Sequence, residues 1–318
     1  MARILICGAT GFIGRNLVER LAANPSHQVT AQYHDRRPFD APGVTWVQAD
    51  LTIAEEVDRT VARTEVIIQA AAVTSGAADI VSRPHIHITD NAVMNSLLFR
   101  AAHDHGVGHF VMFSCSILYL SSDQPRREED FTGDVHPPYH GGAWNKIYFE
   151  KMAEFFAGLG RTRYTVLRHS NIYGPHDKYD PDRSHMFGAT IRKVETATAD
   201  EIVVWGAGTE TRDLLYVDDL MDAVEAVLVR QDQPFALFNI GAGKAVRVRD
   251  VVQMIIDASG RALRIVHDTT KPTIPTHIHL DCRHAANTLG WRPKTPLDAG
   301  IAKTLAWYRD NFPPSPSD

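Results

Sequence analysis

A glycine turn between a strand and a helix opens the sequence. Residues 3–7 are a short apolar run, GATGFIG follows at residues 8–14, and RNLVERLAAN then has the apolar spacing of a helix. The first glycine permits a tight turn, the second lets the backbone approach a pyrophosphate, and the third lets the helix pack closely on the strand. Backbone amides at the helix N-terminus attract the phosphates. The turn predicts dinucleotide contacts from Gly8, Gly11, Phe12, Ile13 and Gly14.

The following chain alternates short apolar runs with helical patterns. QVTAQY, VTWVQAD, EVIIQAAA, HFVMFSCS and YTVLRHS have the character of buried strands. This alternation is typical of an α/β fold with a doubly wound parallel sheet, the Rossmann architecture. After residue 170 the pattern is mixed, and it predicts a smaller α/β C-terminal substrate lobe. We expect a dinucleotide-binding domain over 1–170 with 213–241 returning to it, and a lobe from 171–212 and 242–318. The crevice between them is the expected site.

Composition limits the partners. The chain has 318 residues, a net charge of −5 and a pI of about 6.3. It therefore lacks the overall positive charge that attracts nucleic acid, and any anionic ligand must be held by local arginines and backbone amides. Cys7, Cys115 and Cys282 are far apart, which favours a reducing compartment over disulfides or a metal site. No apolar run approaches the ~20 residues that span a bilayer. We also see no signal-peptide layout, and we expect a cytoplasmic protein without a membrane partner.

The end of the second strand bears on the choice between NAD and NADP. An acidic residue there would bind the ribose hydroxyls of NAD, but Tyr33 occupies that position. Arg36 and Arg37 follow closely and suit a 2′-phosphate, so we expect NADP, with NAD as the alternative. The two arginines are otherwise a solvated surface pair. Asp50 either accepts from the adenine amino group or caps a loop. Two neighbours complete the predicted contacts here, His34 and Leu51.

Motifs farther along the chain occur in a familiar order. They are Ala70-Ala71-Ala72, Asn91, SCSILY, Lys146, NIYGP at 171–175 and RDLLYVDD at 212–219. With the glycine turn, they resemble the extended short-chain dehydrogenases/reductases, the NAD(P)-dependent nucleotide-sugar epimerase/dehydratase family, over essentially the whole chain. The middle is most similar to the members that act on GDP-4-keto-6-deoxysugars. The resemblance implies a nucleotide-sugar substrate and a homodimer formed through helices around 91–105 and 144–158. It also implies cofactor contacts from Ala70, Ala71, Ala72, Asn91 and Lys146.

The sequence departs from that family at its catalytic residues. The family has a tyrosine four residues before the lysine and a Ser or Thr at a strand end, but this chain has Gly142 and Cys115. Tyr139 precedes Lys146 by seven residues, which is ~10.5 Å along a straight helix instead of ~6 Å. A bend at the glycines would bring its hydroxyl back. Tyr139 is therefore either the acid/base group or a pocket-lining residue.

Cys115 is either catalytic or a small apolar residue. Because side chains alternate along a strand, either Cys115 or both Ser114 and Ser116 face the nicotinamide. We carry Cys115 and Ser116 as catalytic candidates and Ser114 as a substrate contact.

The resemblance also assigns residues to the substrate. His185 matches a histidine that serves in epimerisation, but Ile117 stands where its cysteine partner would be. Arg212 matches an arginine that grips the diphosphate, although a pair with Asp213 or Asp218 is the alternative. Asn171 and Arg192 are the remaining predicted substrate contacts.

Two classes of function follow. The first is an enzyme that modifies a nucleotide-activated sugar by hydride transfer at C4, as an epimerase, dehydratase or 4-keto reductase. The second is a protein that binds cofactor and nucleotide sugar without redox turnover, because position 142 lacks the tyrosine. Acid/base work by Cys115 and His185 beside a spectator cofactor is a third, weaker option.

Overall fold

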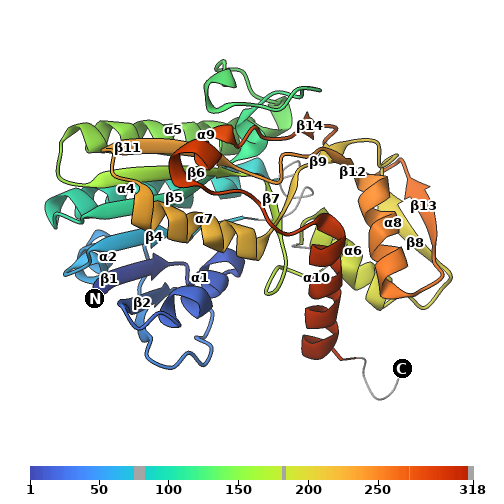
Figure 1. Ribbon diagram of the computed structural model, residues 1–318, viewed down its shortest axis with the longest axis horizontal. Coiled ribbons are helices and arrows are strands. Elements are labelled where there is room, and N and C mark those ends of the chain that lie inside the picture. The colour runs from blue at the N-terminus through green and yellow to red at the C-terminus, as the bar shows by residue number, and fades with distance from the viewer. Residues whose placement is uncertain (75–82, 181–183, 272, 314–318) are drawn as a thin grey trace.

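Seven parallel strands form the main sheet of the computed structural model, which describes residues 1–74, 83–180, 184–271 and 273–313 (Figure 1). Their order is β11-β6-β5-β4-β1-β2-β3, so the chain reverses direction across the sheet between β1 and β4. The doubly wound sheet expected from the sequence is confirmed. The strands are β1 (Ala2–Cys7), β2 (His27–Tyr33), β3 (Thr45–Gln48), β4 (Val66–Gln69), β5 (His109–Cys115), β6 (Arg163–His169) and β11 (Phe235–Ile240).

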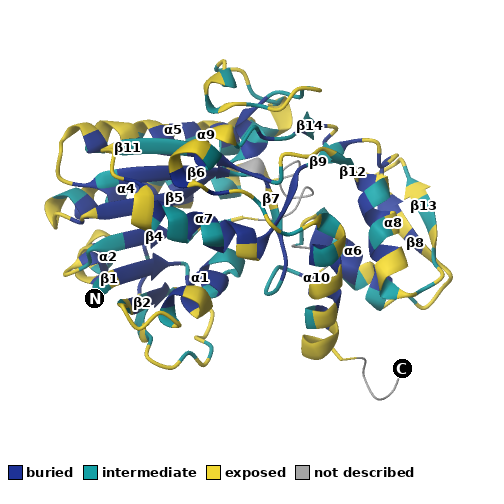
Figure 2. Cartoon of the chain, viewed as in Figure 1, coloured by how far each residue is buried: buried dark blue, intermediate teal, exposed yellow. Residues whose placement is uncertain are grey.

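Helices cover both faces of this sheet, and its central strands are buried throughout (Figure 2). Alternate strand residues pack into two separate cores. One core faces α1 (Phe12–Ala22), α7 (Val217–Arg230) and α9 (Arg283–Leu289). The other faces α2 (Ala54–Val61), α4 (Thr89–Asp104) and α5 (His140–Gly158). Burial on both faces explains the continuous apolar runs of the strands.

After α7 the chain returns to the main sheet as β11, which pairs in parallel with β6 from Phe235 to Ile240. A third core lies in the second half of the chain and is formed largely by α6 (Met186–Glu195), α8 (Val248–Ser259) and α10 (Leu297–Asn311). Three small sheets accompany these helices, pairing β7 (Asn171–Tyr173) with β10 (Leu214–Tyr216), β8 (Glu201–Trp205) with β13 (Arg264–Asp268), and β9 (Thr211–Arg212) with β12 (Val246–Arg247) and β14 (His277–Ile278).

Four short 3₁₀ helices lie in the connections: η1 (Pro84–His87), η2 (Ser116–Leu118), η3 (Glu128–Asp130) and η4 (Pro137–Tyr139). η4 leads directly into α5, which begins at His140. Gly141 and Gly142 are therefore helical, because the helix that packs on the sheet extends through them. Among the helices of the described ranges, none has the length and apolar character needed to cross a bilayer.

A buried ion pair joins α5 to the sheet. The Arg168 guanidinium on β6 donates from Nε and Nη2 to the Glu150 carboxylate, at 2.9 and 2.6 Å, and both side chains are about 5% exposed. Arg168 Nη1 also donates to the Tyr119 hydroxyl at 2.7 Å and to the Glu128 carbonyl at 2.9 Å. The pair therefore fixes α5 against β6 and the loop after β5.

Removing one partner of this pair should unfold the protein more easily, because it leaves a buried charge without a counter-ion. We expect Glu150→Gln to lower the free energy of unfolding by about 3 kcal/mol or more, measured by urea denaturation. Glu154→Gln is the matched control, because it breaks the exposed Lys151–Glu154 pair on the same helix and should cost less than about 1 kcal/mol. Equal losses in the two variants would contradict the structural role of the buried pair.

Candidate active site

The glycine turn between β1 and α1 lets neighbouring backbone segments lie unusually close to it. Gly8 has φ +68°, and a Cβ there would lie 2.5 Å from Cα of Ala71. A Cβ at Gly14 would collide with the Gly8 carbonyl, so this glycine allows α1 to pack on the turn. Gly11 is the N-cap of α1, whose first turn has no acidic residue. The amides at the start of α1, those of Phe12 and Ile13 included, suit an anion.

Side chains after β2 and β3 border this turn. Arg36 Nη1 donates to the Thr10 carbonyl at 3.0 Å, which places the guanidinium beside the turn. His34 lies between Asp35 (3.3 Å) and Asp50 (3.7 Å). The Asp50 carboxylate also accepts from the Thr52 amide and hydroxyl, and these hydrogen bonds lower the pKa of Asp50.

Other predicted contacts of this region are fixed by packing. Tyr33 packs edge-on against Trp46 at a centroid distance of 6.2 Å, which accounts for an aromatic residue at this position. Leu51 is buried in the core below β3, and Arg37 is exposed beside the turn.

The loop after β4 is held by two buried amides. Asn91 accepts from the Val73 amide at 2.9 Å and donates to the carbonyls of Val73 and His87. The Gln69 side chain bonds both the amide and the carbonyl of Ala71. Asn91 thus positions the backbone of 70–73, where the sequence predicts contacts from Ala70, Ala71 and Ala72.

Lys146 reaches from α5 to the end of β5. Its Nζ donates to the Phe113 carbonyl at 2.8 Å. Desolvation lowers the pKa of Lys146, while Cys115 and Glu150 act in the opposite direction. The ammonium group is therefore fixed at the carboxyl end of the sheet, where open α/β sheets bind their ligands.

Cys115 influences the pKa of both Lys146 and Tyr139. Burial raises the pKa of the Cys115 thiol, and the nearby Lys146 partly offsets this rise. Burial likewise raises the pKa of the Tyr139 phenol, with Arg212 lowering it and Cys115 raising it. The structure thus brings Cys115 and Arg212, which are distant in sequence, close to Tyr139, and Cys115 close to Lys146.

The serines beside Cys115 are placed differently. Ser114 is fully buried, and its hydroxyl has no hydrogen-bond partner in the described part of the chain. Ser116 is 8% exposed and begins the η2 turn. Cys115, between the two serines, is half-buried and acts electrostatically on Lys146.

Gly142 lies on the α5 turn that precedes Lys146. A Cβ there would lie 3.7 Å from Cδ1 of Ile117, an ordinary contact distance. The missing tyrosine therefore does not reflect a backbone that only glycine can adopt.

Two histidines accompany Lys146. His185 is the N-cap of α6, and desolvation together with the charges of Lys178 and His87 lowers its pKa. His169 ends β6 beside Cys115 in the parallel register. Burial lowers the pKa of His169 to about 4, and Lys146 and His185 add to this effect. The sequence reasoning missed His169, although its place at the carboxyl end of a predicted strand was an available signal.

Arg212 binds carbonyl groups and not the neighbouring acids. Its Nη1 donates to Thr276 O and Oγ1, both at 3.1 Å, and its Nη2 donates to Ile274 O at 3.1 Å. The Asp213 carboxylate instead accepts from the amides of Ala242, Gly243 and Leu280. Neither acid pair proposed from the sequence forms, because the adjacent strands supply better partners.

The other two predicted substrate contacts lie in different places, Asn171 beside Asp213 and Arg192 beside Tyr179. Asn171 Nδ2 donates to the Asp213 carbonyl at 3.2 Å. Arg192 Nη1 donates to the Tyr179 carbonyl at 3.3 Å.

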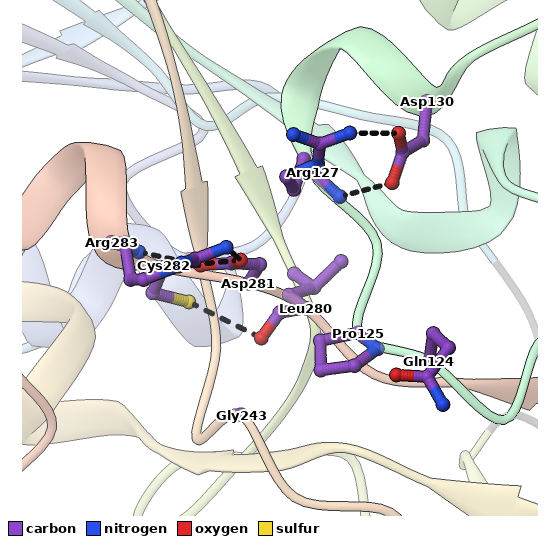
Figure 3. A pocket seen from close by; sticks show the side chains of 9 residues that line it. All are labelled: Gln124, Pro125, Arg127, Asp130, Gly243, Leu280, Asp281, Cys282 and Arg283. Atoms are coloured by element: carbon purple, nitrogen blue, oxygen red, sulfur yellow. Dashed lines mark hydrogen bonds and ion pairs between the residues drawn. The ribbon is translucent and has the colours of Figure 1, made fainter.

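A cavity of about 590 Å³ lies between the 124–130 loop and the chain around Leu280 (Figure 3). Its charged side chains pair with one another, Arg127 with Asp130 and Arg283 with Asp281. The lining leaves no charge unpaired, and we assign this cavity no ligand.

Proteins of known family are similar to nearly the whole of this chain. The chain is 29% identical to putative GDP-L-fucose synthase 2 of Arabidopsis thaliana, over 98% of this chain and 92% of that protein. It is 30% identical to dTDP-glucose 4,6-dehydratase of Streptomyces antibioticus, over 97% of this chain and 92% of that one. The solved structure of MoeE5 in complex with UDP-glucuronic acid and NAD is 27% identical, with a TM-score of 0.84 over 98% of this chain and 100% of that one.

The family resemblance inferred from the motifs is confirmed by a match over most of the chain. Residues 4–241 match the NAD dependent epimerase/dehydratase family, a range that holds the glycine turn, Lys146 and Arg212. The chain belongs to the NAD dependent epimerase/dehydratase family.

Proposed function

We propose that this chain is an NAD(P)-dependent enzyme that modifies a nucleotide-activated sugar by hydride transfer at C4. Family membership supports the class of reaction, and the names of the relatives point to nucleoside-diphosphate sugars. A GDP-sugar is our first choice of substrate, because a GDP-L-fucose synthase aligns over nearly the whole chain. The observation that carries the proposal is the half-buried cluster of Lys146, Cys115 and Tyr139 at the sheet end.

The residues present fit a nicotinamide dinucleotide. The turn at Gly8 and Gly14 leaves no room for side chains, and the start of α1 offers free amides to a diphosphate. A bound nicotinamide would supply or accept the hydride. NADP is our preferred cofactor, because Arg36 and Arg37 stand where its 2′-phosphate is bound in this fold and Tyr33 replaces the acid that would favour NAD.

Tyr139 is our proposed proton donor. Burial keeps the pKa of Tyr139 above its ordinary value, so the phenol is protonated at neutral pH. A protonated phenol suits the reductive direction, in which hydride reaches C4 of a 4-keto sugar and the phenol gives its proton to the keto oxygen. Lys146 would hold the ribose of the bound cofactor, and Arg212, whose charge lowers the pKa of Tyr139, would balance the phenolate that forms. Solvent then returns the proton to Tyr139.

Other residues have positioning roles in this proposal. Arg212, Asn171 and Arg192 bind the diphosphate and sugar, and Arg212 exchanges carbonyl partners for phosphate oxygens. His185 and Ser116 border the sugar. We place the enzyme in the cytoplasm, where its three unpaired cysteines would persist.

Lys146→Ala should abolish hydride transfer, because the variant loses the cation that would hold the cofactor ribose at the sheet end. We expect turnover to fall at least about 100-fold, followed as the absorbance of reduced nicotinamide with GDP-, dTDP- and UDP-sugars and their 4-keto forms. Lys151→Ala, an exposed lysine on the same helix, is the control and should keep full activity. Unchanged turnover in Lys146→Ala would contradict the proposal. Binding of cofactor and sugar without turnover of any substrate in the wild type would instead favour a binding protein.

Tyr139→Phe tests the proton donor. We expect the reductive rate to fall by about 10²- to 10⁴-fold with little change in sugar-nucleotide binding, measured by calorimetry. The wild-type rate should stay level through neutral pH and decrease only at alkaline pH, because the raised pKa keeps the phenol protonated until then. A Tyr139→Phe enzyme with the wild-type rate and pH profile would move the acid/base role to Cys115, which Cys115→Ser then tests.

We also propose a homodimer formed through α4 and α5. Trp144, Tyr148 and Phe155 are 43, 41 and 57% exposed and recur at helical spacing on α5. Val93 on α4 is 38% exposed, and the Tyr148 hydroxyl lies 3.2 Å from Ser96 Oγ, which links the two helices. Such an exposed apolar patch is typical of an interface.

Phe155→Glu should give a monomer, because a charge in the patch would be buried without a partner on association. Light scattering after size-exclusion chromatography measures the mass. Val229→Glu, which changes an exposed residue on α7, should leave the dimer intact. A wild-type monomer, or a Phe155→Glu dimer, would refute this interface.

A further inference from the structure

A histidine and a serine connect the chain before η4 to the chain after η2. The amide of Ser121 donates to His136 Nε2 at 3.2 Å, and the Ser121 hydroxyl lies 3.1 Å from the same nitrogen. Because an amide can only donate, Nε2 is the unprotonated nitrogen, and the hydroxyl donates to it as well. The proton of the neutral imidazole is then on Nδ1. The imidazole thus binds this serine through a bifurcated hydrogen bond.

The same serine also binds β14. The amide of His277 donates to Ser121 Oγ at 3.0 Å, so this hydroxyl accepts one hydrogen bond and donates another. The Ser122 amide donates in turn to the His277 carbonyl at 2.7 Å. His136 is therefore tied to the strand that pairs with β9, which carries Arg212.

His136 stands immediately before the turn that carries Tyr139. Pro137 and Pro138 follow it, and its carbonyl accepts the Tyr139 amide at 2.9 Å, which closes η4. Because proline fixes φ near about −65°, these two residues leave the turn little freedom. Holding the imidazole therefore fixes the point from which the tyrosine side chain extends.

The Tyr139 side chain returns to the chain beside β14. Burial raises the pKa of the phenol, while Arg212 and a hydrogen bond with Thr276 act against this rise. Thr276 is 4% exposed, and its Oγ1 accepts from Arg212 Nη1 at 3.1 Å. Since Thr276 directly precedes His277, the contacts form a closed ring. Its members, in order, are Tyr139, Thr276, His277, Ser121 and His136.

Apolar contacts restrain the same side chain without directing its hydroxyl. The tyrosine packs against a cluster formed by Leu118, Ala143 and Ile147. Contacts of this kind are not directional. The hydrogen bonds on either side of the turn therefore decide where the hydroxyl lies.

We infer that the hydrogen bonds between Ser121 and His136 position the Tyr139 phenol for proton transfer, in place of the helical spacing that this chain lacks. The inference rests on the proposed role of Tyr139 as the proton donor. A tyrosine one turn before Lys146 would be held by the backbone of α5, but a tyrosine ahead of the helix needs separate support. Ser121 and His136 carry out no chemical step and act only through η4 and β14.

The rate of hydride transfer in His136→Ala tests this role. We expect kcat for reduction of a 4-keto sugar nucleotide to fall about tenfold or more, because displacement of the proton donor is costly. KM for the sugar nucleotide should change less than about twofold. His136→Gln should recover part of the loss, because its side-chain oxygen can accept the same hydrogen bonds. Ser121→Ala should also lower kcat. Ser122→Ala is the matched control, since the hydroxyl of this neighbouring serine binds the Gln124 amide, and it should keep the wild-type rate.

A double-mutant cycle shows whether His136 acts through the phenol. In Tyr139→Phe, adding His136→Ala should cause no further loss of rate, because no hydroxyl is left to position. Equal losses in the two backgrounds would refute the positioning role, as would a wild-type kcat in both His136→Ala and Ser121→Ala. Circular dichroism checks the folding of every variant.

A crystal structure of His136→Ala supplies a readout without catalysis. The Tyr139 hydroxyl should have moved away from Thr276, and an unmoved hydroxyl would refute the inference. A wild type that turns over no sugar nucleotide would refute the proposed enzyme and the role in proton transfer, while this structure would still test the hold on Tyr139. Turnover that is lost in Lys146→Ala and Tyr139→Phe but unchanged in His136→Ala would support the enzyme and refute the positioning role.

Discussion

The buried pair of Glu150 and Arg168 is the interaction on which the candidate site depends. Two ions out of water are tolerated only when each has close partners, and here the guanidinium also binds the Tyr119 hydroxyl and the Glu128 carbonyl. The same helix carries Lys146 one turn earlier. Any rotation of α5 that moved the lysine would expose or separate these charges. The position of Lys146 at the sheet end is therefore set by the core beneath it.

The candidate site has the family's lysine, Lys146, but its phenol, that of Tyr139, comes from a position three residues before the usual tyrosine. In the family that this chain resembles, the catalytic tyrosine stands one turn before the lysine and lies on the same helix face. Here Tyr139 ends the η4 turn just ahead of α5, and Cys115 acts electrostatically on both the phenol and the ammonium group. The groups interact through tertiary packing and not through helical spacing. A phenol near Arg212 is also close to the residue proposed to bind the substrate diphosphate.

The two halves of the chain meet at α1. Asn16 and Glu19 bind the 175–176 segment, while the buried Asp213 ties the chain beside Arg212 to the segments after β11 and β14. These contacts hold the proposed substrate residues at a fixed distance from the glycine turn. Binding of a dinucleotide and binding of a sugar nucleotide would then act on one connected framework. The 175–176 segment is thereby linked to the helix that begins at the glycine turn.

The sequence by itself determined the parallel sheet and the glycine turn, because strand burial and close backbone packing impose local patterns. The resemblance to the family also identified Lys146 and the empty tyrosine position. Only the tertiary structure placed Cys115 near Lys146 and Tyr139, paired His169 with Cys115 across two strands, and gave Arg212 carbonyl partners. It alone placed Trp307 and the glycine turn in the lining of one groove. These contacts join residues far apart in sequence, and their geometry follows from how helices and strands pack, which no local pattern encodes.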